Sequence, residues 1–207
     1  NYALSDGQVY QLSELYPPGL IGYWSFDESG ATPIVTDSSD YRDDGALGLD
    51  PSDASIRVSG HRGNGLDFAT LKDNTYGVRI PDQGQLNLDK SAFSISFWMK
   101  APESMFPTSN DMDYYVLCKG SIGTDPAIGS TGKRFDLEFK NKTMRFAIDD
   151  ANDANGGGKD ELSADATPFF TGDWVNVVLI RDTADQQLKV YLNAALVGEK
   201  GISKALS

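Results

Sequence analysis

Residues 93–100 read Phe-Ser-Ile-Ser-Phe-Trp-Met-Lys, with a large apolar side chain at every first, third, fifth and seventh position. Successive side chains of an extended chain point to opposite sides, so this period of two predicts a strand with one core-facing side. The core-facing side holds Phe93, Ile95, Phe97 and Met99, and the other side holds Ser94, Ser96, Trp98 and Lys100. The stretch therefore predicts a half-buried strand of an antiparallel sheet.

Later segments extend this pattern. Apolar side chains alternate in 135–139 and again in 144–148, and Asn141-Lys142 between them predicts a hairpin whose arms share an inner face. Residues 174–180 are nearly all apolar, which is typical of a strand covered on both sides, and 188–192 alternate again. We expect a core between two sheets that includes Phe93, Ile95, Phe97, Phe135, Leu137, Phe139, Phe146 and Val190.

Composition bounds the class of protein. The 207 residues suit one large β-sandwich with a single core, and 21 glycines punctuate short apolar runs. With 30 acidic and 18 basic residues the net charge is −12, which disfavours nucleic acid and anionic membrane surfaces as partners. No apolar run is long enough to insert into a membrane. The lone cysteine, Cys118, cannot form an internal disulfide, and its setting predicts a buried strand residue.

Less regular segments flank these strands. Residues 1–18 are weakly patterned and are interpreted as a lead-in segment or linker. Two long polar stretches, 101–114 and 149–168, are predicted to be loops of the kind that carry binding residues on a rigid sandwich.

Several motifs, taken in order, give the chain a family resemblance. It resembles the laminin-G-like branch of the concanavalin-A-like lectin and glucanase superfamily over residues 19–199. The segments that carry the likeness are Gly19–Glu28, Asp37–Leu47, Gly60–Phe68, Phe93–Lys100 and Trp174–Gly198. The resemblance implies an all-β fold, a two-sheet antiparallel jelly-roll β-sandwich spanning 19–207, in a secreted or cell-surface protein.

The chain departs from the family pattern in two places. Asn193-Ala194 stands where the family usually has an Asp-Gly hairpin, and predicts a different turn type. After Glu199 the family adds a further strand or two, which Gly201–Ser207 is too short to supply. Either those last strands are missing from this sequence or the sheet is completed in another way.

The resemblance also raises the question of catalysis. Glucanases of this superfamily carry Glu-x-Asp-x-Glu on one strand, and the segment Arg134 to Glu138 is similar, with Asp136 between them. Arg134 occupies the nucleophile position, and an arginine cannot attack an anomeric carbon. We therefore expect no enzymatic activity, and interpret the polar side of this strand as a solvated outer face.

Acidic side chains suggest a structural calcium ion rather than zinc, because one histidine and one cysteine cannot form a zinc cluster. The family resemblance implies calcium near the opening strand, where Asp27, Asp37 and Asp44 are the candidate ligands. A second acidic stretch, 149–161, fails the EF-hand spacing and is interpreted as a solvated loop.

Glycan binding requires an exposed aromatic ring that stacks on a sugar, with polar groups beside it. The candidates are Trp98, Tyr114, Tyr115, Asp136 and Glu138. The first hypothesis is a non-catalytic carbohydrate-recognition module whose partner is a glycan. The second is a protein-binding or adhesion module of the same fold, and the third, least favoured, is a glycoside hydrolase.

Overall fold

The computed structural model describes residues 19–30, 32–48, 56–68, 77–86, 88, 91–110, 113–119, 133–150 and 159–202, with the backbone alone at 133, 134, 149, 150 and 159. The chain divides into two compact units, Asn1–Asn87 and Leu88–Ser207, and each is described by itself. The predicted lead-in, residues 1–18, lies outside the described residues. A single domain over 19–207 stays a prediction.

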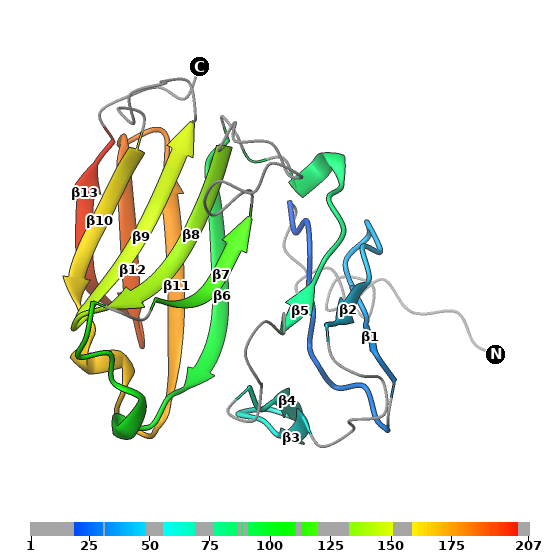
Figure 1. Ribbon diagram of the computed structural model, residues 1–207. Coiled ribbons are helices and arrows are strands. Elements are labelled where there is room, and N and C mark those ends of the chain that lie inside the picture. Colours follow the sequence, from blue (N-terminus) through cyan, green and yellow to red (C-terminus); the bar gives the residue numbers. More distant parts are fainter. Residues whose placement is uncertain are drawn as a thin grey trace. The chain divides into compact units, whose positions relative to one another are not determined.

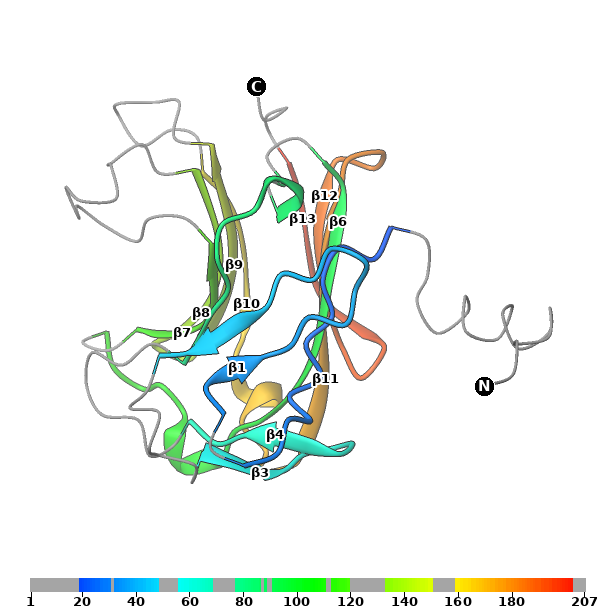
Figure 2. The same cartoon turned by 90° about the vertical axis from the view of Figure 1, so that its right-hand side faces the viewer.

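The second unit contains two four-stranded antiparallel sheets, ordered β13-β12-β11-β6 and β10-β9-β8-β7. Figures 1 and 2 show them as two facing layers. This arrangement confirms the predicted antiparallel β-sandwich. The strands are β6 (Phe93–Lys100), β7 (Tyr114–Lys119), β8 (Lys133–Lys140), β9 (Thr143–Asp150), β10 (Lys159–Asp165), β11 (Trp174–Asp182), β12 (Gln187–Leu192) and β13 (Ala195–Gly201), with short 3-10 turns η3 (Glu103–Met105) and η4 (Thr167–Phe169).

The core of the second unit lies between these sheets, because the inward side chains of both form one apolar cluster. Phe139 packs edge-on against Phe169 and Phe170, with ring centroids 5.1 Å and 5.0 Å away. The predicted core is confirmed in part. Leu137, Phe139, Phe146 and Val190 are buried, while Phe93, Ile95, Phe97 and Phe135 are partly buried against the same cluster.

Two-residue turns close two of the hairpins. Asn141 and Lys142 join β8 to β9 with φ of 42° and 64°, as a type I′ turn requires. Asn193 and Ala194 join β12 to β13 with φ of 49° and 66°. Both central residues are again left-handed, so the prediction of a different turn type at this hairpin is wrong.

Two expectations about the β7–β10 sheet are also wrong. The stretch 149–168, predicted to be a loop, contains β10, whose apolar signal is weak because its outward side chains are polar. In β7 the pairing register shifts between Tyr115 and Leu117, so the strand gains an extra residue. Leu117 therefore packs on the core, and Cys118, predicted to be buried, is exposed.

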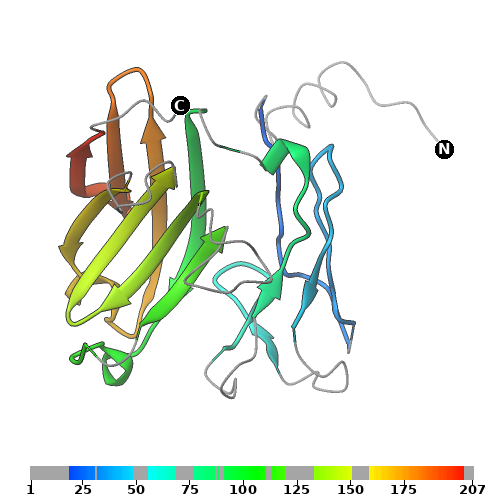
Figure 3. The ribbon, with the colours of Figure 1, turned by 45° about the horizontal axis from the view of Figure 1, so that its top comes forward.

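The described residues of the first unit form one three-stranded sheet and one hairpin. The sheet joins β1 (Ile34–Val35), β2 (Gly45–Leu47) and β5 (Val78–Arg79) in that order. The hairpin pairs β3 (Arg57–Ser59) with β4 (Asn64–Leu66) and is drawn in cyan in Figure 3, and η2 (Gly84–Leu86) follows β5. None of the helices in the described part of the chain is long and apolar enough to cross a membrane.

Candidate functional site

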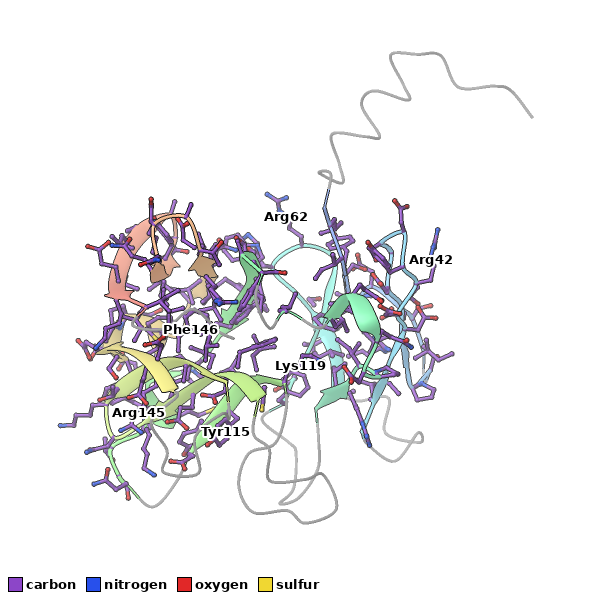
Figure 4. All side chains as sticks on the ribbon, turned by 90° about the horizontal axis from the view of Figure 1, so that it is seen from above. Arg42, Arg62, Tyr115, Lys119, Arg145 and Phe146 are labelled. Carbon is purple, nitrogen blue, oxygen red and sulfur yellow. The ribbon has the colours of Figure 1, made fainter. Side chains whose placement is uncertain are left out.

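The predicted ligand-binding residues do not form one site. Trp98 points outward from β6, on one outer face of the sandwich, whereas Tyr115, Asp136 and Glu138 lie on the outer face of the opposite sheet. Tyr114 packs against the core. Figure 4 shows Phe146 between the two sheets, with Arg145 and Tyr115 on the other side of their sheet. Two separate faces must therefore be considered.

A polar network crosses the outer face of the β7–β10 sheet, which we call the ladder face. Glu138 is central: it accepts a hydrogen bond from the Tyr115 hydroxyl, and one Glu138 oxygen lies 3.0 Å from Arg145 Nη1. Arg145 Nε lies 3.7 Å from a Glu161 oxygen, which also accepts a hydrogen bond of 3.0 Å from the Ser163 hydroxyl. The network thus links β7, β8, β9 and β10.

The carboxylates of the ladder face are buried. Asp136 is 2% exposed and Glu138 is 6% exposed, which corrects the interpretation of this strand side as solvated. Tyr115 and Arg145 contact Glu138 from the two neighbouring strands and exclude water from it. Burial raises the pKa of Tyr115, and its hydrogen bond to the Glu138 carboxylate raises that pKa further. Tyr115 therefore keeps its proton, and its hydroxyl donates a hydrogen bond to Glu138.

The described side chains of the ladder face bind one another and do not match the carboxylate arrangement of a glycosidase. Position 134 in β8 holds arginine, so the nucleophile of the glucanase pattern is missing. The carboxylates of Glu138 and Glu161 are already engaged by Arg145 and by hydroxyl donors. A glycosidase needs two carboxyl groups facing a substrate, one of them able to deliver a proton.

The opposite outer face, on the sheet β13-β12-β11-β6, is different, and we call it the aromatic face. Trp98 is 41% exposed and Leu196 is 47% exposed. Strand pairing places Trp98 opposite Asn176, and places Val178 between Ser96 and Tyr191. The alternation of β11 leaves Trp174, Asn176, Val178 and Ile180 half-buried, so this strand is not covered on both sides as predicted.

Asn176 holds the aromatic face in place. Its Nδ2 donates to Ser96 Oγ and to the Phe97 carbonyl of β6, both at 3.3 Å. Its backbone N–H donates to Asn193 Oδ1 at 2.9 Å, and Asn193 returns a bond of 2.9 Å from its own N–H to the Asn176 carbonyl. One residue thus ties Trp98's strand to the β12–β13 turn, which gives the exposed indole a rigid support.

Charged groups gather at the far end of the aromatic face. Lys189 lies 2.9 Å from Asp182 and 3.1 Å from Asp185. Hydrogen bonds from the Asp185 backbone and from Lys189 lower the pKa of Asp182. Lys189 is therefore paired with both carboxylates. At the end that carries Trp98, the one charged side chain among the described outward residues is Lys100, opposite Trp174.

The predicted calcium ligands lie in the first unit. Asp37 is fully buried, and its two oxygens accept four hydrogen bonds of 2.7–2.9 Å, from the N–H groups of Tyr23, Ser39 and Asp43 and from the Ser39 hydroxyl. Burial raises the pKa of Asp37, but these donors outweigh it, so the pKa lies below its ordinary value. A carboxylate has about four lone-pair sites. Asp37 therefore has none left for a metal ion.

Asp27 and Asp44 also accept hydrogen bonds from backbone N–H groups. Asp27 Oδ1 accepts the Asn64 N–H at 2.7 Å, and Asp44 Oδ1 accepts the Asp37 N–H at 2.9 Å. Among the residues with described side chains, no group of three or more His, Cys, Asp and Glu side chains is arranged to hold a metal ion. The donor set does not fit calcium in this conformation. Calcium binding stays a prediction, tested by melting curves with calcium and with a chelator.

Sequence reasoning missed several residues of both faces. Arg145 could have been found, because a two-residue turn at 141–142 fixes a register that pairs it with Glu138. Tyr191 lies on the outward side of β12, and alternation alone does not show whether such a ring is packed or exposed. No sequence pattern identifies Asn176 as part of the site, because an asparagine in an apolar strand does not show which neighbours it binds.

Comparison with known sequences gives a family. Residues 72–207 match the profile of a laminin-G family described as the concanavalin A-like lectin/glucanases superfamily. No curated protein sequence matches the chain.

Two solved toxin domains show the same fold at low identity, and a third structure has a lower similarity. The binding domain of Paraclostridial mosquitocidal protein 1 is 13% identical with a TM-score of 0.57, over 87% of this chain and 39% of that chain. The binding domain of botulinum neurotoxin serotype D is 15% identical with a TM-score of 0.53, over 82% and 37%. The CBM40 of a Ruminococcus gnavus sialidase is 20% identical with a TM-score of 0.40, over 55% and 54%. The chain thus spans about two fifths of either toxin domain.

Proposed function

Because the chain belongs to the concanavalin A-like lectin/glucanase superfamily, we propose that it is a non-catalytic carbohydrate-recognition module of a secreted or cell-surface protein. The observation that carries the proposal is Trp98, a tryptophan 41% exposed on a rigid sheet face. Family membership supplies the scaffold, but this scaffold hosts unrelated functions, so the argument rests on the aromatic face.

The chemistry of the aromatic face suits a sugar. A pyranose offers an apolar C–H face and a rim of hydroxyls, so its binding site needs a ring to stack on and polar groups beside it. Trp98 supplies the ring, and Asn176 and Ser96 lie next to it in the sheet. Since Asn176 is hydrogen-bonded on both sides, the platform is organised before any ligand arrives.

The test is binding to a glycan array by the wild-type chain and by Trp98→Ala. We expect selective binding by the wild type and a loss of about tenfold in the variant, because aromatic stacking contributes about 1–2 kcal/mol and about 1.4 kcal/mol corresponds to tenfold. Tyr41→Ala is the matched control, since Tyr41 is 51% exposed in the first unit. Binding that survives Trp98→Ala, or no binding to any glycan, contradicts the proposal.

Two further results separate the rival functions. Leu196, 47% exposed beside Tyr191, favours an adhesion module as the second candidate. Capture of a defined protein partner, lost in Leu196→Asp and without glycan binding, would support that reading. Catalysis is tested by incubation with β-glucans, galactans and host-type glycans. We expect no release of reducing ends above the blank, and the same result for Glu138→Gln.

A further inference from the structure

We infer that the aromatic face binds a chain of three or more sugar units along its length, and not a single terminal sugar. This inference rests on the proposed function and names the class of ligand. It follows from the spacing of two aromatic side chains, Trp98 and Tyr191, and from the polar side chains of Ser96 and Asn176 beside Trp98.

The two rings stand too far apart for one sugar. Trp98 belongs to β6 and Tyr191 to β12, with β11 between them. Trp98 pairs with Asn176, whereas Tyr191 pairs with Val178, two residues further along β11. Two strand spacings are roughly 10 Å and two residues are roughly 7 Å. A pyranose ring is shorter than this diagonal, so a ligand that stacks on both rings needs a sugar at each end and one between.

The surface between the rings is formed by Asn176 and Val178 of β11, and Ser96 lies beside Asn176 on the strand of Trp98. Ser96 and Asn176 both have short polar side chains that point to the outer face. Asn176 uses its amide protons on Ser96 and Phe97, and its Oδ1 accepts no bond among the described residues. The Ser96 hydroxyl accepts from Asn176, and its own proton finds no acceptor there. Asn176 Oδ1 is therefore open as an acceptor, and the Ser96 hydroxyl is open as a donor.

A sugar hydroxyl both donates and accepts, so it matches this donor and acceptor pair. The middle sugar of a chain would lie over Asn176 and Val178 while its neighbours stack on the two rings, with Ser96 at its side. Half-buried Val178 adds apolar contact. Each subsite contributes separately, so affinity should rise with each sugar until the face is filled.

The experiment is calorimetry with cello-, xylo- and chito-oligosaccharides of one to six units, alongside the glycan array. In at least one series we expect affinity to rise from one to three units by at least a hundredfold and then to level off. Trp98→Ala and Tyr191→Ala should each lower trisaccharide affinity at least tenfold. Tyr191→Phe, which keeps the ring, should retain most of the affinity, and Tyr41→Ala should retain all of it.

The outcomes are distinguishable. A monosaccharide that binds as tightly as the trisaccharide, with Tyr191→Ala unchanged, overturns the chain-length inference and leaves the proposed function standing. Absence of binding to every oligosaccharide and every array glycan contradicts the proposed function, and the inference with it. Circular dichroism and melting curves of each variant show whether a lost affinity reflects unfolding. Should Tyr191→Ala fail to fold, Tyr191→Leu, which keeps bulk without the ring, replaces it and must show the same tenfold loss.

Discussion

The two outer faces of the second unit are supported by the same apolar core but present opposite chemistry. On the ladder face, Glu138 and Glu161 both pair with Arg145, and Tyr115 donates a hydrogen bond to Glu138. On the aromatic face, Trp98 and Leu196 are exposed, and Ser96 and Asn176 beside Trp98 each keep a hydrogen-bonding group open to a ligand. Pairing within the sheet stabilises it, whereas an exposed ring beside open polar groups favours binding.

The comparison also shows how burial changes the meaning of a residue. Carboxylates such as Glu138 suggest ligand binding when they are imagined in solvent, but at 6% exposure they need internal partners. A tryptophan on the polar side of a strand is more often packed, yet Trp98 is 41% exposed. We therefore place binding on the aromatic face and cohesion on the ladder face.

The largest effect is expected in the shared core. Phe146→Ala should lower the free energy of unfolding of the second unit by about 3–5 kcal/mol, because it leaves a cavity between the sheets. Both sheets should unfold in a single transition, because Phe146 is fully buried between them. Urea denaturation followed by tryptophan fluorescence measures this loss. Reduced stability of one face alone would mean that the sheets do not share a core.

A smaller loss is expected from the ladder. Arg145→Ala leaves Glu138 buried without its cation, and should lower the free energy of unfolding by about 2 kcal/mol. Glycan affinity should not change. The double variant Arg145→Ala with Glu138→Gln should recover part of the loss, since no buried charge then lacks a partner. A change in glycan affinity in Arg145→Ala would indicate that the ligand binds the ladder face, and would contradict the proposal.

The hairpin of the aromatic sheet allows a stabilising test. Ala194 has a φ of 66°, a left-handed conformation that penalises a residue with a Cβ. Ala194→Gly should raise the free energy of unfolding by about 1 kcal/mol and leave glycan affinity unchanged. Lys142→Gly, at the equivalent turn position of the ladder sheet with a φ of 64°, is the matched variant and should act in the same direction. A loss of stability in both would refute the turn assignment.

The smallest effect is a change of slope with pH. The folded pKa of Tyr115 lies above its ordinary value of 10.0, so the unfolded chain loses this proton first as pH rises. The contribution of Tyr115 is therefore fully present below pH 10 and declines above it. Tyr115→Phe should be less sensitive to alkaline pH than the wild type, as measured by urea midpoints from pH 8 to 11. Equal slopes would contradict the bond to Glu138.

Local patterns predicted much of this fold, for physical reasons. Alternation along 93–100 and 135–148 indicated the sandwich and half of its core, since period and burial are directly linked. It could not indicate the shift after Tyr115, because a bulge depends on the partner strand. It also could not divide the predicted ligand residues between two faces, because sheet order is not a local property.

The candidate calcium site shows the same limit. The spacing of Asp27, Asp37 and Asp44 is compatible with a cation, but spacing does not show which backbone N–H groups reach a carboxylate first. Asp37 accepts three bonds from backbone N–H groups, one of them from distant Tyr23, and a fourth from the Ser39 hydroxyl. Whether an acidic side chain is a ligand or a structural acceptor is decided by geometry.

The most direct test of the account is where a glycan perturbs the molecule. Amide and indole chemical shifts of the isotope-labelled chain would be followed during titration with the tightest-binding oligosaccharide. We expect changes at the Trp98 indole and at the amides of Ser96, Asn176 and Tyr191, and no change at Glu138 and Arg145. Shifts centred on the ladder face, with the Trp98 indole unaffected, would contradict the account.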